Sequence, residues 1–183
     1  MKIGVYVGSF NPPHKGHIKI VETLIKEKYV DKIVIIPTNN YWNKTNLINI
    51  NHRLNMLNFF KNENIIINNT LNNLEYTYQI IRELKKDNNE YSLILGADNI
   101  IEFDKWKNYD ELLELELLII NRNNINIKKY LEKLNKKDKY KIINIDNINI
   151  SSTYIRENLN KKEITNIIDK QVLNYIQKEN LYS

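Results

Sequence analysis

The sequence predicts an α/β fold, in which a parallel β-sheet carries helices on both faces and a helical part follows at the C-terminal end. Short apolar runs, each long enough for a buried strand, recur along the 183 residues. Longer amphipathic segments separate these runs. Strands that alternate with helices favour a parallel sheet, because each helix carries the chain back to the edge where the next strand begins. The length predicts one domain over residues 1–183.

Six apolar runs are predicted as strands, at residues 3–7, 33–36, 65–67, 93–95, 117–120 and 142–145. Apolar side chains at three- and four-residue spacing predict the intervening helices, at residues 16–28, 51–61, 76–86 and 127–135. Ile18, Val21 and Leu24, for example, share one face of the first of these. Asp169 is predicted as the N-cap of a further helix that runs through Lys178 and closes the domain.

Residues with special backbone or side-chain chemistry follow the predicted strands. They stand at residues 8–17, 37–44 and 96–98, at Arg122, and at residues 151–153. In a parallel sheet of this kind, ligands bind at the carboxyl ends of the strands, near the point where the strand order reverses. We therefore expect the functional site at that edge.

The charge of the chain indicates a solvated surface rather than a nucleic-acid partner. The net charge is +5, but the lysine pairs at 128–129, 136–137 and 161–162 interleave with acidic residues or asparagine. The absence of cysteine excludes disulfides and thiolate metal sites. The apolar runs are too short for a secretory signal or a membrane span, so we expect a cytoplasmic protein without a membrane partner.

Rare residue types gather near the N-terminus. Residues 4–17 hold three of the four glycines, two of the three prolines and two of the three histidines in the chain. Gly8 follows an apolar run, where the missing Cβ lets the backbone approach a ligand. His14 and His17 stand at the start of a predicted helix, where free backbone N–H groups favour an anion. An isolated histidine there could merely cap the helix, but the pair favours a phosphate site.

Two motifs carry a resemblance to a known superfamily. The spacing of Gly8, Phe10, Pro12, His14, Gly16 and His17 resembles the signature of the nucleotidyltransferases, and the sequence ISSTYIR at residues 150–156 resembles their ISSTxxR element. The resemblance implies a Rossmann-like fold and the transfer of a nucleoside monophosphate from a triphosphate, with release of pyrophosphate. It implies catalytic roles for His14, His17 and Arg156.

The same resemblance implies a set of ATP-binding residues: Gly8, Ser9, Phe10, His17, Gly96, Asp98, Ser151, Ser152, Thr153 and Arg156. Two of them have a structural alternative, because Ser151 and Asp98 could each cap the helix that follows. Arg156 lies three and four residues after Thr153 and Ser152, on one helical face, where we expect it to meet the pyrophosphate.

Further matches resemble the nicotinate-nucleotide adenylyltransferases: LGADN at residues 95–99 with Phe103 and Trp106 after it, Tyr76-Thr77, and the ending from Val172 to Tyr182. This resemblance implies that ATP and nicotinate mononucleotide are the partners, and that Lys44, Thr77 and Trp106 contact the substrate. Mg²⁺ is expected to arrive with ATP and not in a metal site built by the protein, because no carboxylate cluster stands out. A homo-oligomer is compatible with the sequence.

Several alternatives stay open. A phosphopantetheine adenylyltransferase shares the first motif, and the choice between nicotinate and nicotinamide mononucleotide rests on one charge. A noncatalytic nucleotide sensor or a nucleic-acid-binding module could keep the same fold, although His14, His17 and Arg156 favour catalysis and the dispersed lysines disfavour nucleic acid. Arg53 fits either a family motif or a structural salt bridge, and Met56 either that motif or the core.

Overall fold

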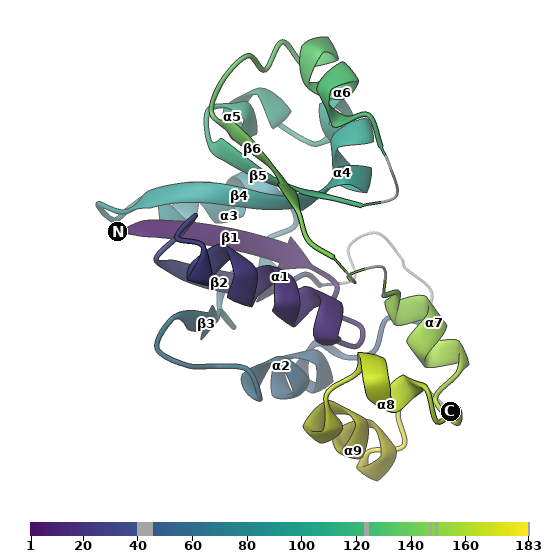
Figure 1. Ribbon diagram of the computed structural model, residues 1–183. Helices are drawn as coiled ribbons and strands as arrows, with labels where there is room; N and C mark the ends of the chain where they lie inside the picture. Colours follow the sequence, from purple (N-terminus) through teal and green to yellow (C-terminus); the bar gives the residue numbers. More distant parts are fainter. Residues whose placement is uncertain (40–45, 123–124, 147, 149, 183) are drawn as a thin grey trace.

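The computed structural model describes residues 1–39, 46–122, 125–146, 148 and 150–182. Its centre is one sheet of six parallel strands in the order β3-β2-β1-β4-β5-β6 (Figure 1). The strands are β1 (Lys2–Gly8), β2 (Lys32–Pro37), β3 (Ile65–Ile67), β4 (Glu90–Gly96), β5 (Glu116–Asn121) and β6 (Tyr140–Asn144). The strand order reverses between β1 and β4, as in doubly wound nucleotide-binding folds. The predicted Rossmann-like sheet is confirmed.

Helices connect the strands. They are α1 (Lys15–Lys26), α2 (Ile50–Asn58), α3 (Thr77–Leu84), α4 (Ala97–Ile101), α5 (Tyr109–Leu113), α6 (Ile127–Lys133), α7 (Ser152–Glu157), α8 (Ile164–Ile167) and α9 (Lys170–Lys178), with 3₁₀ turns at Leu71–Asn73 and Phe103–Lys105. The four long helices between the strands are confirmed, each ending two or three residues earlier than predicted. The periodicity predicted neither α4 nor α5, because five residues are too few to show a helical period, and only the possible cap at Asp98 pointed to a helix near α4.

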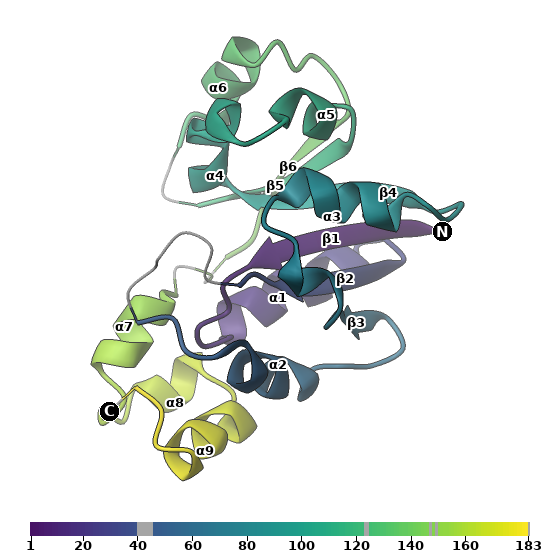
Figure 2. The ribbon, with the colours of Figure 1, turned by 180° about the vertical axis from the view of Figure 1, so that it is seen from behind.

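Both faces of the sheet are buried, which explains why the strands read as continuous apolar runs. Side chains alternate across the sheet: Leu93 and Leu95 of β4 pack with α3, α4, α5 and α6, whereas Ile94 packs with α1 and α2. Figures 1 and 2, which view the molecule from opposite sides, show α1 in front of the sheet and α3 behind it.

The C-terminal helices form a separate apolar cluster at one end of the sheet. Ile155 of α7, Ile164 of α8 and Val172 of α9 pack with Met56 of α2, so the interpretation of Met56 as a core residue is confirmed. Asp169 caps α9 as predicted, because its carboxylate accepts the backbone N–H of Gln171 at 2.7 Å. The predicted helical C-terminal part is therefore present, and it carries the second nucleotide motif on α7.

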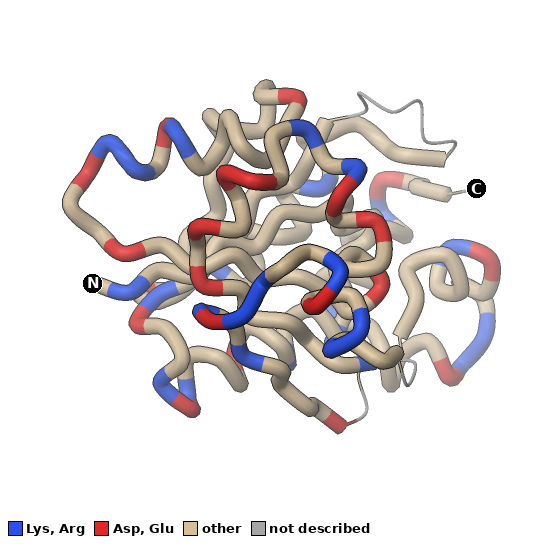
Figure 3. Tube along the Cα trace, turned by 90° about the horizontal axis from the view of Figure 1, so that it is seen from above, with Lys and Arg blue, Asp and Glu red and all other residues tan. Residues whose placement is uncertain are grey.

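Charged residues of both signs are interspersed along the chain, as Figure 3 shows from above. Within the part of the chain that is described, none of the helices has the length and apolar character that a membrane span requires.

Candidate active site

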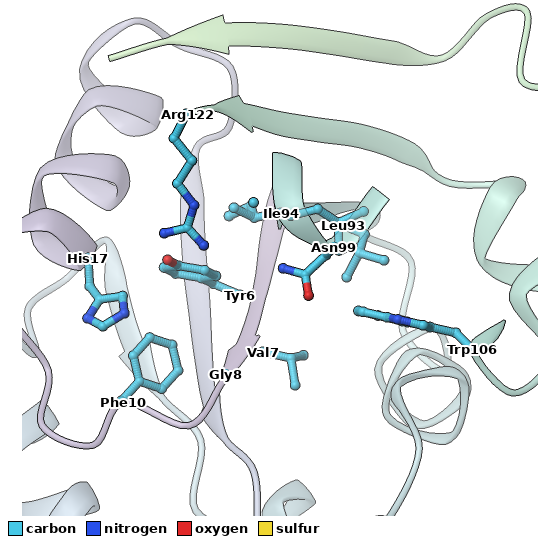
Figure 4. A pocket seen from close by; sticks show the side chains of 12 residues that line it. Tyr6, Val7, Gly8, Phe10, His17, Leu93, Ile94, Asn99, Trp106 and Arg122 are labelled. Carbon is cyan, nitrogen blue, oxygen red and sulfur yellow. The ribbon is translucent and has the colours of Figure 1, made fainter. Parts of the chain in front are cut away.

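A cavity of about 140 Å³ opens at the carboxyl ends of β1 and β4, where the strand order reverses (Figure 4). Tyr6 and Gly8 line it from β1 and Gly96 from β4, with His17 at one side and Trp106 at the other. Its position is the one expected from the polar residues that follow the predicted strands.

His14 and His17 form an interlocked pair at the start of α1. Each backbone N–H donates to the Nδ1 of the other ring, at 3.2 Å for His14 N–H and 3.4 Å for His17 N–H. The rings stack with centroids 3.7 Å apart. His14 is therefore the helix cap, as the structural alternative supposed, and the cap holds His17 against the cavity. Phe10 packs edge-on against His17, with 5.0 Å between ring centroids.

Both imidazoles are neutral at physiological pH. Burial, together with a smaller effect of the Arg122 charge, lowers the pKa of His14 to about 4. Burial also holds the pKa of His17 well below its usual value, assisted by His14 and Arg122. Because each Nδ1 accepts a hydrogen bond, the proton of each neutral ring is on Nε2. The pair can therefore donate Nε2–H groups without carrying charge.

The low pKa of His14 predicts a loss of stability in mild acid. Between pH 6.5 and pH 4 the unfolded chain protonates this imidazole while the folded protein does not, so the free energy of unfolding falls as the pH falls through that window. At about 1.4 kcal/mol for each pH unit, His14 alone lowers it by about 3 kcal/mol. Urea unfolding at pH 7 and pH 4.5 measures this loss. His14→Gln should reduce the difference and His52→Gln should preserve it; an unchanged difference in His14→Gln would contradict the assignment.

Arg122, which follows β5, pairs with Asp98 above Gly96. Its Nη2 lies 2.6 Å from Asp98 Oδ1. A Cβ on Gly96 would lie 2.5 Å from that carboxylate oxygen and 2.7 Å from Arg122 Nη2, so glycine leaves room for the ion pair. Asp98 is not the N-cap of α4, because Gly96 occupies that position. In Figure 4 the Arg122 guanidinium faces the side of the cavity that holds Tyr6 and His17.

The second motif contacts the first one directly. Ser152 Oγ donates to the carbonyl of Pro12 at 2.9 Å, and Arg156 Nη1 donates to the carbonyl of Asn11 at 2.7 Å. Arg156 Nη2 also donates to Thr153 Oγ1 at 3.1 Å, as expected for residues on one helical face. The fold thus joins the loop after β1 to helix α7, about 140 residues further along the sequence.

Ser151 is the N-cap of α7, where its Oγ accepts the backbone N–H of Tyr154 at 3.4 Å. The structural alternative for this serine is therefore correct. The contacts of Ser152 and Arg156 place the start of α7 beside the loop that contains Asn11.

Arg53 has a structural position beneath the first motif. It is 1% exposed, and its guanidinium donates to the carbonyls of Ser9 at 2.9 Å, Thr38 at 2.6 Å and Ile48 at 3.1 Å. Burial lowers its pKa to about 10, so it stays charged at neutral pH. The described contacts of Arg53 are thus backbone carbonyls, not the carboxylate that a salt bridge requires. Through them it anchors Ser9, one of the predicted ATP-binding residues.

The predicted substrate residues lie in different places. Trp106 lines the cavity and packs on Phe103 with ring centroids 5.1 Å apart. Thr77 is the first residue of α3 and is half-buried, but it is not one of the residues that line the cavity. Lys44 lies outside the described residues.

Three polar residues of the cavity wall were not among the predicted catalytic and binding residues: Tyr6, Asn99 and Arg122. Arg122 had a signal, since it is polar and follows a predicted strand. Tyr6 had none, because it lies inside an apolar run. Its hydroxyl is nevertheless at the cavity, where burial raises its pKa to about 12 and keeps it protonated. Asn99 belongs to a matched motif but gave no indication of which way it faces.

The described residues contain no group of three His, Asp or Glu side chains placed to hold a metal ion. Nucleotidyltransferases of this kind generally use a divalent metal with ATP.

Comparison with known proteins agrees with this geometry. Residues 5–158 match the cytidylyltransferase-like family. A "Probable nicotinate-nucleotide adenylyltransferase" of Fusobacterium nucleatum is 37% identical, over 98% of this chain and 98% of the relative. One from Acholeplasma laidlawii is 35% identical, over 97% and 96%.

A solved structure gives the same result. The Plasmodium falciparum nicotinic acid mononucleotide adenylyltransferase complexed with NaAD superposes with a TM-score of 0.84 at 26% identity, covering 99% of this chain and 97% of that one. The chain therefore belongs to the cytidylyltransferase-like family and, within it, to the nicotinate-nucleotide adenylyltransferases.

Proposed function

We propose that this protein transfers AMP from ATP to nicotinate mononucleotide, giving nicotinate adenine dinucleotide and pyrophosphate. The observation that carries the proposal is the direct contact between the two nucleotide motifs, through Ser152 with Pro12 and Arg156 with Asn11, beside the cavity at the switch point of the sheet. Identity of 37% and 35% to two probable nicotinate-nucleotide adenylyltransferases over nearly the whole chain supports the choice of reaction.

The reaction needs alignment more than it needs a base. The phosphate of nicotinate mononucleotide is an anion at neutral pH, so one of its oxygens can attack the α-phosphorus of ATP without prior deprotonation. A new P–O bond forms there, and the bond to the β-phosphate breaks with its electron pair leaving on pyrophosphate. The protein's contribution is to hold the two phosphates in line and to stabilise the charge that develops.

In this proposal His14 and His17 donate Nε2–H groups to phosphate oxygens. Neutral imidazoles suit this role, because they donate without losing a proton to the anion. Gly8 and Phe10 shape the approach to the α-phosphorus. On the other side, Arg156 holds the departing pyrophosphate as a fixed cation.

The remaining predicted residues complete the two substrate sites. Ser151, Ser152 and Thr153 offer hydroxyls and the free N–H groups of α7 to the triphosphate. Gly96 and Asp98 approach the nucleotide ribose, and Trp106 stacks on the pyridine ring, which its flat indole suits. Thr77 and Lys44 are proposed to contact the mononucleotide.

Mg²⁺ is the proposed metal. A metal ion that arrives with the triphosphate would supply charge neutralisation at the phosphate oxygens, while Arg156 and the imidazole pair would supply the contacts from the protein.

The preference of the enzyme among possible acceptors tests the proposal. With ATP and Mg²⁺, we expect pyrophosphate release with nicotinate mononucleotide to exceed that with nicotinamide mononucleotide or 4′-phosphopantetheine, measured under one condition. A preference for the nicotinamide form would keep the mechanism and refute the acceptor. Preference for phosphopantetheine would assign another adenylyltransferase activity, and ATP binding without release from any acceptor would indicate a nucleotide sensor.

A further inference from the structure

Asn11, in the loop between β1 and α1, joins four segments of the chain although it belongs to none of the recognised motif positions. Its side chain is 5% exposed. Its carbonyl accepts Arg156 Nη1 at 2.7 Å, and its Nδ2 donates to the carbonyl of Asn46 at 2.7 Å. Its Oδ1 accepts the hydroxyl of Tyr182 at 2.8 Å and the backbone N–H of Ile48 at 3.4 Å. Any movement of Asn11 therefore moves the carbonyl that anchors Arg156.

Tyr182 reaches Asn11 from the segment that follows α9. Figures 1 and 2 both place the C-terminal end of the chain beside α7. Tyr182 also lines, with Arg156, a cavity of about 400 Å³ between α7 and α9. Its backbone φ is 65°, in the left-handed region that a bulky side chain rarely adopts. Such a conformation persists only where surrounding contacts over-determine it, and these conformations concentrate near functional sites.

The Tyr182 hydroxyl is equipped to donate. Burial raises its pKa well above the usual value, although the charges of Arg156 and Arg53 partly oppose the shift. The phenol therefore keeps its proton at any physiological pH. The hydroxyl donates to the side chain of Asn11, and the backbone carbonyl of the same residue anchors Arg156.

We propose that Tyr182 is a positioning residue, which acts through Asn11 to hold the Arg156 guanidinium where the pyrophosphate leaves. The inference rests on the proposed function, because it assigns Tyr182 to the step in which Arg156 meets that product. It gives the C-terminal segment a part in adenylyl transfer in addition to its packing against the apolar cluster of the C-terminal helices.

Tyr182→Phe tests the proposal, because it removes the hydroxyl and keeps the ring. We expect kcat for pyrophosphate release to fall roughly 3- to 10-fold, the scale of one neutral hydrogen bond, with KM for nicotinate mononucleotide unchanged within about twofold. The matched control is Tyr175→Phe. The Tyr175 hydroxyl contacts His52 Nδ1 and Asn55 Nδ2, each at 2.9 Å, at the contact between α9 and α2. If the two variants lose Tm to a similar extent but only Tyr182→Phe loses kcat, the positioning role is supported. If both variants lose kcat equally, the proposal is overturned.

A double variant separates positioning from general destabilisation. If Tyr182 acts through Arg156, then Tyr182→Phe should lower kcat no further in an Arg156→Ala background. A further loss of the full size would overturn the proposal. Asn11→Ala removes the acceptor of the same bond and reports on it even if Tyr182→Phe folds poorly; it should reproduce the loss of kcat, and normal kcat would count against the proposal.

Binding distinguishes failure of this inference from failure of the proposed function. Calorimetry with inorganic pyrophosphate needs no reaction, and Tyr182→Phe should weaken its binding roughly 3- to 10-fold while Tyr175→Phe leaves it unchanged. If the wild-type protein is inactive but Tyr182→Phe alone weakens pyrophosphate binding, the proposed acceptor is wrong and the role of Tyr182 is supported. An active wild-type protein whose pyrophosphate affinity and kcat both survive Tyr182→Phe would refute the role alone.

Discussion

His17→Ala is expected to lower kcat for pyrophosphate release by about 100-fold or more, the scale of losing one preorganised hydrogen-bond donor at a developing charge. The imidazole lies on the cavity wall, packed edge-on by Phe10 and stacked on His14, so its Nε2–H is fixed before the substrate arrives. Alanine removes the donor and also the Nδ1 that accepts the backbone N–H of His14. A large effect on turnover with a modest effect on folding is the expected combination.

Two further variants, His17→Gln and His52→Ala, serve as a conservative substitution and a control. Glutamine keeps an N–H donor and an acceptor near the same place, so part of the activity should return. His52 belongs to α2 and contacts Tyr175, away from the cavity, so its loss should leave kcat within about twofold. Near-normal turnover in a folded His17→Ala variant would remove His17 from the mechanism.

Much of the fold could be predicted because local patterns and the global architecture agree. The apolar runs became the strands of the sheet, and the residues expected after the strands now line its carboxyl edge at Gly8, Gly96 and Arg122. Both nucleotide motifs could be recognised because their chemistry is confined to short spacings, such as the three-residue spacing of His14 and His17. The assignment of this pair to phosphate stays a prediction until variants are measured.

The contacts between distant segments could not be predicted. Arg53 resembles any surface arginine of an amphipathic helix, and only the folded chain brings the carbonyls of Ser9 and Thr38 to it. Asn11 stands inside the first motif at a position that the motif leaves open, yet it receives Arg156 and Tyr182 from nearly the opposite end of the chain. These contacts form only when the helices and loops pack on the sheet, and no local spacing in the sequence indicates them.

Arg156→Lys is expected to lower kcat by about 100-fold, although the substitution keeps the positive charge. The guanidinium makes two directed hydrogen bonds from one side, to the Asn11 carbonyl and to Thr153 Oγ1. These bonds hold the plane of the group, and its remaining N–H donors are free to meet two oxygens of pyrophosphate at once. An ammonium group offers a point charge without this fork, so it cannot keep both anchors and bind the product bidentately.

Arg82→Lys is the matched control, because Arg82 also makes a forked contact, with Glu111 at 2.8 and 2.9 Å on the exposed side of α3 and α5. An exposed ion pair of this kind contributes little, so kcat and Tm should change hardly at all. If Arg156→Lys loses as little activity as Arg82→Lys, then charge alone suffices at the leaving group. The contact between the two motifs would then serve the fold, and stabilisation of the departing pyrophosphate would fall to the imidazole pair and the N–H groups of α7.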